Sequence, residues 1–287
     1  MLLYAAVDAD TLVKTENDWR AHRETGLRAP DGWLSVAGLF WLHSGPMKVG
    51  SDPHSDIVLP SSAPQRIGTL QLVSGVVTFV PEKSVNVTVN GKPAAKMTLK
   101  PDTSDHPDIV QAGHILLTVI KRGSKTGVRM RDSDAATRRT FTGCKWYPVS
   151  QKWLVNAKWV PYPAVKKIKI TNILGMTDEE DSPGYAEFTI DGKTLRLDPV
   201  VDDGDFSFMF KDSTSGKTTY APGRFLDADK PKNGVIVLDF NQAYNPPCAF
   251  TAYATCPLPP RQNNLPIAVE AGEMKYSDRA APAGGSR

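Results

Sequence analysis

One short strand near the end of the chain carries the residues best suited to chemistry. The segment VIVLDFN, residues 235–241, has the composition of a strand, in which side chains two residues apart lie on the same face. Asp239 and Asn241 would therefore project side by side from its carboxyl end, roughly 6–7 Å apart. Tyr244 and Asn245 follow directly. This set could line the mouth of a pocket; alternatively, Asp239 and Asn241 cap the turn that follows the strand.

A proline-rich loop follows this strand and holds two of the three cysteines. In AYNPPCAFTAYATCPLPP, residues 243–260, the prolines fix φ and remove backbone donors, so the loop is stiff without secondary structure of its own. A disulfide between Cys248 and Cys256 requires the loop to fold back on itself. A nucleophilic Cys248 requires a base, and no histidine lies nearby. Two buried thiols are the simplest interpretation.

The sequence gives little support to a metal site. Zinc would need Cys144 and a fourth ligand beside the two loop cysteines, and the spacing differs from that of known zinc motifs. No histidine lies near the loop. We therefore predict no metal and no cofactor.

Three further charged residues could bind a ligand or act as acid and base. Arg224 could clamp a carboxylate ligand or pair with Asp239 as a structural salt bridge, and Arg131 has the same ambiguity. Glu273 follows an Ala-Gly break and is free to point inward, where it could form an acid–base pair with Asp239. The complete set of candidates has two parts. The catalytic candidates are Asp239, Tyr244, Cys248 and Glu273, and the ligand-binding candidates are Arg224, Asn241, Asn245 and Arg131.

Composition and missing motifs exclude several classes of function. The net charge is +3 with no dense Lys/Arg stripe, which argues against nucleic-acid binding. No apolar run reaches membrane-spanning length, and the N-terminus lacks the charged region of a secretory signal, so we expect a cytoplasmic protein. The chain has no Gly-rich phosphate loop, dinucleotide fingerprint, HExxH or GxSxG. Nucleotide-driven and serine-hydrolase chemistry are therefore disfavoured.

The elements that must position these residues are mainly strands. One amphipathic helix is predicted over residues 11–27, capped by Thr15 and packed through Leu12, Trp19 and Leu27. After it the pattern becomes β, with turn signals between strands at close spacing. We predict hairpins at three places and an all-β sandwich or barrel architecture. The hairpins lie at 85–94 with an Asn-Gly turn, at 114–132, and at 186–199 with an Asp-Gly turn.

The first half of the chain resembles a forkhead-associated domain. The resemblance rests on Val49-Gly50, on the SDIVL strand at 55–59, and on the VNG turn at 89–91. It implies a β-sandwich that binds phosphothreonine. The phosphate-binding arginine would follow the glycine, but this chain has Ser51 there and only Arg66 nearby as a cation. We therefore expect the sandwich without phosphopeptide binding.

A wider resemblance extends over residues 31 to 273. The chain is similar to the family called domain of unknown function 1684, and that name implies no activity and no catalytic residues. The resemblance is most specific in VLDFNQAYNPPCAFTAYATCPLPPRQNNLPIAVEAGE. The blocks that carry it are 31–45, 131–148, 210–228 and 237–273.

The expected organisation is one helix followed by two β domains. The fold class is mainly β, with a forkhead-associated-like sandwich followed by a second antiparallel β domain packed against it. The tail has the polar composition typical of disorder. The predicted segments are a helix over 1–29, the sandwich over 30–145, the second β domain with the proline-rich loop over 146–276, and a disordered tail over 277–287.

The candidate residues favour an enzyme that acts on a small organic molecule. Hydrolysis, elimination or isomerisation by acid–base chemistry, without a cofactor, fits their side chains best. The site would lie in the second β domain. The alternative is a non-catalytic binding or scaffold protein in which the degenerate sandwich recognises a partner. The sequence leaves the substrate and the oligomeric state open.

Overall fold

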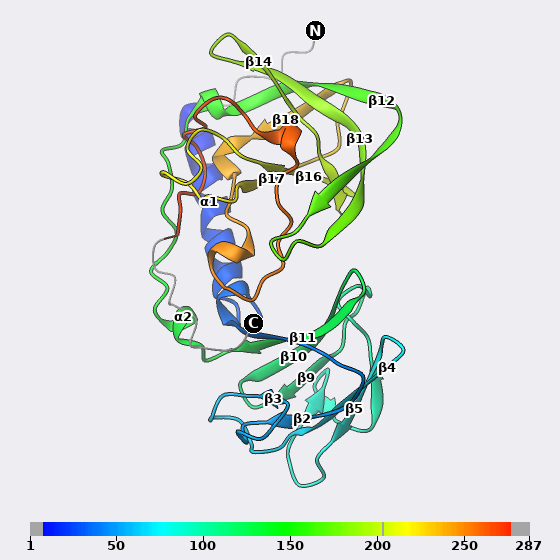
Figure 1. Cartoon of the computed structure of the whole chain (residues 1–287). Coiled ribbons are helices and arrows are strands. Elements are labelled where there is room, and N and C mark those ends of the chain that lie inside the picture. The colour runs from blue at the N-terminus through cyan, green and yellow to red at the C-terminus, as the bar shows by residue number, and fades with distance from the viewer. Residues whose placement is uncertain (1–7, 203, 277–287) are drawn as a thin grey trace. The chain divides into compact units, whose positions relative to one another are not determined.

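The computed structural model describes residues 8–202 and 204–276, and these form two compact units (Figure 1). One unit comprises the described residues up to Gly26 together with those from Thr142 onward, and the other comprises Leu27–Phe141. The predicted fold class is confirmed: one long N-terminal helix is followed by several mainly antiparallel sheets. The tail at 277–287 lies outside the described residues.

The N-terminal helix α1 begins earlier than predicted, at Ala9, and runs to Arg28. Thr15 does not cap it, because the chain is already helical there. The carboxylate of Asp8 accepts the backbone N–H of Thr11 at 2.9 Å, which satisfies one of the free donors of the first turn. The buried face of α1 includes Leu12, as predicted, but also the carboxylate of Glu16. This face is therefore partly polar.

The unit Leu27–Phe141 consists of two sheets around one apolar core. The Asn90-Gly91 turn has positive φ at both residues, as its predicted hairpin requires. A short helical turn, η1 (Trp33–Ser35), precedes the first strand, and α2 (Ala136–Arg139) follows the last. One sheet has the order β1 (Val36–Trp41), β11 (Lys125–Asp132), β10 (Ile115–Arg122), β9 (Ile109–Ala112), β6 (Thr88–Val89) and β7 (Lys92–Pro93). The other has the order β3 (Ile57–Val58), β2 (Gly45–Gly50), β4 (Gly68–Val73), β5 (Val76–Pro81) and β8 (Met97–Leu99).

The unit formed by the described residues up to Gly26 and from Thr142 onward is called the second unit here. It also contains two sheets, and α1 lies alongside them (Figure 1). Its core is dominated by aromatic and aliphatic side chains such as Phe208, Leu238 and Phe240. The predicted Asp-Gly hairpin joins β13 to β14. The first sheet has the order β14 (Lys193–Leu197), β13 (Thr177–Ile190), β12 (Leu154–Thr171) and β18 (Val235–Asp239). The second has the order β15 (Val200–Asp202), β16 (Asp205–Phe210) and β17 (Arg224–Ala228).

Strand β18 ends two residues earlier than predicted. Ile236 and Leu238 are buried and Val237 is exposed, so the predicted alternation is present. After Asp239 the chain turns into a short 3-10 helix, η3 (Phe240–Gln242). Asp239 and Asn241 therefore do not project side by side from one strand face. Instead, Asp239 caps the turn, which is the alternative that its sequence also allowed.

The proline-rich loop has more local structure than its composition predicts. It contains a helical turn, η4 (Pro247–Ala249), and another, η5 (Arg261–Asn263), follows it. The stretch near Cys256 then pairs with the end of β12. The N–H of Leu258 donates to the carbonyl of Thr171, and the N–H of Ile173 donates to the carbonyl of Cys256, both at 2.9 Å. This pairing holds the loop against a sheet edge.

Neither α1 nor α2, the two α-helices in the described part of the chain, has the length and apolar character that a bilayer crossing needs.

Candidate functional site

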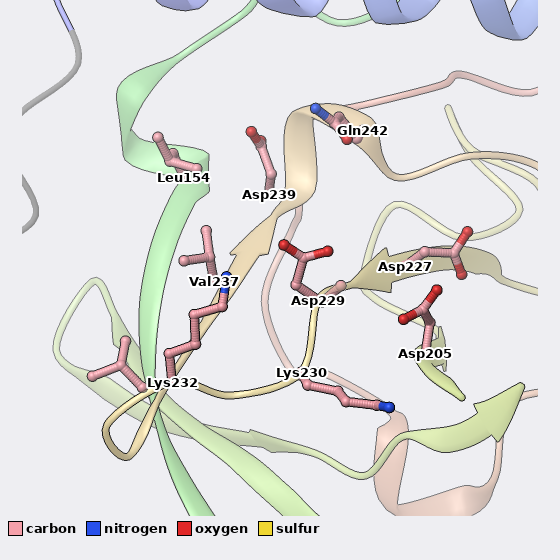
Figure 2. Close-up of a pocket in the computed structure, with 11 residues that line it drawn as sticks. Leu154, Asp205, Asp227, Asp229, Lys230, Lys232, Val237, Asp239 and Gln242 are labelled. Carbon is pink, nitrogen blue, oxygen red and sulfur yellow. The ribbon is translucent and has the colours of Figure 1, made fainter. Parts of the chain in front are cut away.

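A cavity of about 400 Å³ opens beside strand β18 in the second unit (Figure 2). It lies between the end of β17, the start of β16 and the strand β18. Asp239 is on its wall, so one of the predicted catalytic residues faces a cavity. The lining residues are Leu154, Asp205, Asp227, Ala228, Asp229, Lys230, Lys232, Val235, Val237, Asp239 and Gln242.

The wall of this cavity carries more negative than positive charge. Four aspartates and two lysines line it, and Figure 2 shows the carboxylates of Asp205, Asp227 and Asp229 gathered on one side, with Asp239 nearer to Gln242. Within residues 8–202 and 204–276, no group of three or more acidic, histidine or cysteine side chains is arranged to hold a metal ion. The cavity is thus better suited to a neutral or cationic organic molecule than to an anion.

Asp239 is held in place by the turn that it caps. One of its oxygens, Oδ1, accepts the backbone N–H of Asn241 at 3.0 Å and the side-chain amide of the same residue at 2.9 Å. Asn241 is itself fixed by Ser150, whose N–H and C=O bond to its amide at 3.0 and 3.1 Å. Asn241 is buried, so it positions Asp239 and has no direct access to a ligand.

Helix α1 brings a second carboxyl group against Asp239. Glu16 is buried, and its Oε1 accepts the side-chain amide of Gln242 at 3.0 Å. Its Oε2 is buried without a hydrogen-bond donor. The two carboxyl groups are close enough for each to perturb the other. A buried carboxyl group that feels the charge of a second one is favoured in its protonated form, and a protonated carboxyl group can donate a hydrogen bond to the other, so we treat Glu16 and Asp239 as a pair that can share one proton.

Burial raises the pKa of both members of this pair, and like charge adds to the rise at Glu16. Burial raises the pKa of Glu16 to about 7, and the negative charge of Asp239 adds to the effect. Burial also raises the pKa of Asp239, while the hydrogen bonds from Asn241 and the charge of Arg20 oppose it. The pair therefore keeps a proton near neutral pH, as two carboxyl groups at a shared site do when their charges repel.

Tyr244 reaches the same cavity through one of its wall residues. Its hydroxyl donates to Oδ2 of Asp227 at 2.8 Å. Its ring packs against Trp19 and Phe225, and the guanidinium of Arg23 lies 4.5 Å from the ring centroid. Tyr244 thus orients a carboxylate of the cavity wall and connects it to helix α1.

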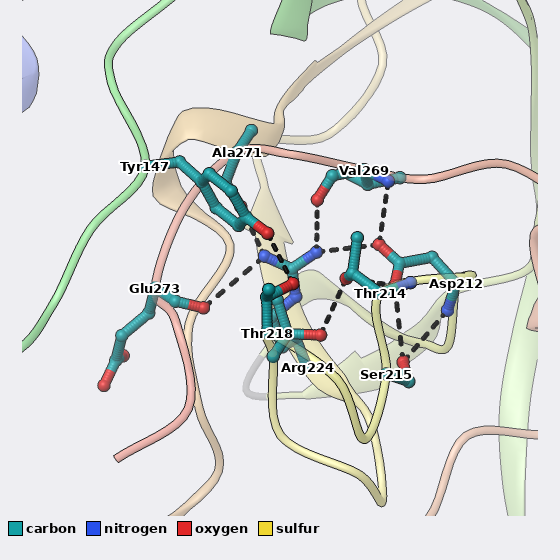
Figure 3. A network of polar contacts seen from close by, with 10 residues as sticks. Tyr147, Asp212, Thr214, Ser215, Thr218, Arg224, Val269, Ala271 and Glu273 are labelled. Carbon is teal, nitrogen blue, oxygen red and sulfur yellow. Dashed lines mark hydrogen bonds and ion pairs between the residues drawn. The ribbon is translucent and has the colours of Figure 1, made fainter. Parts of the chain in front are cut away.

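Arg224 does not line the cavity, and it pairs with Asp212 instead of Asp239. Figure 3 shows its guanidinium among its partners. It is 1% exposed and forms an ion pair with Asp212, whose Oδ2 it meets at 2.9 Å. It also donates to the carbonyls of Val269, at 2.9 Å, and of Ala271. Neither of the two roles that the sequence allowed for Arg224, a ligand clamp or a salt bridge with Asp239, is formed here, because Asp212 and the carbonyls of the C-terminal segment already use the guanidinium donors.

Glu273 points inward, as its position after a glycine predicts, but it pairs with other residues than Asp239. Gly272 has positive φ and lies too close to the carbonyl of Ala243 to carry a side chain. The Glu273 carboxylate accepts the backbone N–H of Asn245 at 3.0 Å and its side-chain amide at 3.1 Å. Arg23 approaches it at 3.5 Å. Burial raises the pKa of Glu273 and Arg23 opposes the rise.

The remaining candidates lie elsewhere. Asn245 is buried against Glu273, and Cys248 is buried in the proline-rich loop. Neither lines the cavity. Arg131 is in the other unit, on β11, where its guanidinium lies 6.0 Å from the ring centroid of Trp33. Burial lowers its pKa against the opposing charge of Asp31. Of the eight candidates, the structure brings Asp239 to the cavity directly, and it brings Tyr244 and Asn241 to wall residues through hydrogen bonds.

Sequence reasoning missed Glu16 and the aspartates of the cavity wall. One signal for Glu16 was present: it lies four residues after Leu12 and three before Trp19, so it occupies the apolar face of the predicted helix. An acidic residue at such a position is buried or paired. Asp205 and Asp227 gave no comparable signal, because adjacent strands bring them together from different parts of the chain.

Comparisons with known proteins match part of the chain. Residues 139–274 match the family model described as Protein of unknown function (DUF1684), so the predicted resemblance is confirmed over this part. Among the solved structures that match is the solution NMR structure of an uncharacterized protein from Haloarcula marismortui. It is 28% identical, the match covers 48% of this chain and 79% of that one, and the TM-score is 0.41. No curated protein matches. The forkhead-associated resemblance stays a prediction.

Proposed function

We propose that this chain is a cofactor-independent enzyme that uses Asp239 as a general acid–base on a small polar molecule held in the cavity beside β18. The observation that carries the proposal is that Asp239, on the cavity wall, is paired with the buried carboxyl group of Glu16 behind it, with the pKa of both groups raised. An acid–base catalyst works best when its pKa lies near the working pH, and few carboxyl groups meet that condition without such a partner.

The two members of the pair have different roles in this proposal. Asp239 faces the cavity and would exchange a proton with the substrate. Glu16 does not line the cavity and would act as a positioning residue that keeps the proton on the pair. Hydrolysis, elimination and isomerisation all need one such proton donor or acceptor, so the reaction belongs to one of these classes.

The charges on the cavity wall indicate which class of substrate the cavity would bind. With four aspartates and two lysines facing the cavity, a polyhydroxylated or amine-bearing molecule would be attracted and a phosphorylated or carboxylated one repelled. Asp205, Asp227 and Asp229 offer acceptors for hydroxyl and ammonium groups. The lysines, Lys230 and Lys232, would limit how much cationic charge the site accepts.

A panel of sugars, amino sugars, lactones and polyamines tests the proposal. Binding is followed by ligand-observed NMR and turnover by product NMR at pH 5 to 8. For a substrate found in this way, Asp239→Asn should reduce kcat at least a hundredfold, because the proton-exchanging group is lost. Glu16→Gln should move the pH profile, and the exposed Asp191→Asn should leave kcat unchanged.

Two outcomes would overturn the proposal. If Asp239→Asn retains full turnover, proton exchange occurs elsewhere in the chain. If a molecule binds in the cavity but no member of its class is converted, the cavity belongs to a binding protein. The same panel therefore separates the enzyme from the non-catalytic alternative.

A further inference from the structure

The two cysteines of the proline-rich loop face each other across it. The backbone N–H of Cys248 donates to Sγ of Cys256 at 3.1 Å, and the backbone N–H of Cys256 donates to Sγ of Cys248 at 3.3 Å. Each sulfur therefore lies close to the backbone of the other residue, and the two side chains are neighbours. The loop is therefore folded back so that the two cysteines are neighbours, which is the first condition for a disulfide.

The backbone around this pair is fixed by contacts that do not involve sulfur. Pro246 and Pro247 precede Cys248, and Pro257 follows Cys256. The N–H of Ala249 donates to the carbonyl of Pro246 at 2.9 Å, and the carbonyl of Cys256 accepts the N–H of Ile173 at 2.9 Å. Because both ends are already held, joining the two sulfurs orders little additional chain.

We propose that Cys248 and Cys256 are a redox modification site, which a small hydroperoxide converts into a disulfide. In the first step one thiolate attacks the peroxide O–O bond, becomes a sulfenic acid and releases water or an alcohol. In the second step the other thiol attacks the sulfenic sulfur, forms the S–S bond and releases water. The two thiols are oxidised by two electrons in total, and the peroxide is reduced by two.

The third cysteine provides an internal control. Cys144 is half-buried beside Glu273, and its backbone N–H donates to the carboxylate of Glu24 at 2.9 Å. Burial and the two neighbouring carboxylates raise the pKa of its thiol, which makes it a poor nucleophile. Cys144 is less buried than the loop pair, so the expected difference rests on the two carboxylates that disfavour its thiolate: peroxide should leave Cys144 reduced while the loop pair reacts.

The disulfide would close residues 248–256 into a covalent ring within a loop that pairs with the end of β12. A closed ring limits the conformations of the unfolded chain, so oxidation should raise the Tm by about 5 °C. The modification site is distinct from the proposed acid–base cavity, since neither cysteine lines that cavity. Failure of one proposal leaves the other intact.

The test uses the full chain, purified under reductant and then exposed to hydrogen peroxide after the reductant is removed. Intact mass spectrometry should show the loss of two hydrogen atoms, and peptide mapping without reduction should link Cys248 to Cys256. Cys144→Ala should behave like the wild type. Cys248→Ala and Cys256→Ala should not lose the two hydrogens, and dithiothreitol should reverse the change in the wild type.

The variants also control for misfolding, because each can be compared with the wild type by circular dichroism before oxidation. Three results would overturn the proposal. The first is a wild type whose mass does not change. The second is addition of oxygen atoms without a crosslink. The third is a disulfide that includes Cys144 or joins two chains.

Discussion

The second unit contains two buried charge clusters, and they differ in how the buried charge is balanced. Around Arg224, one cation meets one carboxylate and carbonyls of the backbone, and its guanidinium makes several hydrogen bonds. Around Asp239, a second carboxyl group, that of Glu16, perturbs the pKa, and one buried oxygen of Glu16 has no hydrogen-bond donor. The first cluster neutralises itself. The second needs a proton.

The difference separates a structural role from a chemical one. We call the cluster of Arg224 and Asp212 the saturated cluster, because its opposite charges are paired. It holds segments together: Arg224 joins β17 to the C-terminal stretch at 269–273, and Asp212 also accepts the N–H of Val269. A like-charge pair costs stability and in return keeps a proton available near neutral pH. Arg224 looked like a ligand clamp by residue type alone, and only its partners show which kind of cluster it belongs to.

The largest effect should come from removing the cation of the saturated cluster. Arg224→Met removes the cation that pairs with the buried carboxylate of Asp212 and the donor to the carbonyls of Val269 and Ala271. We expect the free energy of unfolding to fall by about 3–5 kcal/mol. Urea denaturation measures this change, with Arg261→Met as the matched control, since Arg261 is exposed. A loss below about 1 kcal/mol would show that the cluster does not hold the segments together.

The stability contributed by the Glu16–Asp239 pair, which we call the proton-sharing cluster, should depend on pH in a way that the contribution of the saturated cluster does not. The pKa of Glu16 is raised to about 7 from its usual value near 4.5, so the folded state holds its proton more tightly than the unfolded chain. Its contribution to stability is therefore full below about pH 4.5 and is lost as the pH rises through about 7.

Glu16→Gln should remove this dependence, because glutamine resembles the protonated acid at every pH. At pH 8 we expect the variant to be more stable than the wild type by an amount of the order of 1–3 kcal/mol, and at pH 4.5 to be nearly equal to it. Urea denaturation at several pH values gives the two curves. Parallel curves would contradict the shared proton.

Tyr244 lies between the two clusters and should have a smaller effect. Its backbone pairs with Phe225, next to Arg224, and its hydroxyl donates to Asp227 on the cavity wall. Tyr244→Phe keeps the ring contacts and removes this one hydrogen bond, so we expect a loss of about 0.5–1.5 kcal/mol. Thermal denaturation measures it. A loss comparable with that of Arg224→Met would mean that the hydroxyl belongs to the saturated cluster.

An exposed ion pair gives the baseline for the comparison. Lys152 and Asp191 meet at 2.8 Å, and both side chains are about half exposed or more. Asp191→Asn keeps a residue that tolerates the positive φ of this turn. We expect a change within about 0.5 kcal/mol, by the same denaturation measurement. A larger loss would show that surface charges in this unit matter as much as buried ones.

Local pattern predicted much of the framework. The alternation in residues 235–241 located β18 and its buried face, and the Asn-Gly and Asp-Gly pairs located two hairpins. The Ala-Gly break before Glu273 placed that side chain inside. These features depend on neighbours in the chain, which is why the sequence reveals them. The early start of α1 was missed because its cap, Asp8, lies outside the periodic segment.

The local sequence pattern did not predict which charged residues pair with each other. Asp239 had two candidate partners in the sequence, Arg224 and Glu273, and the structure pairs it with neither but with Glu16, on a helix more than two hundred residues away. The sequence by itself determined the strands, the turns and which side chains face inward, because these follow from periodicity and backbone preference. Only the tertiary structure decided which buried charges meet, because electrostatic partners are set by distance in space.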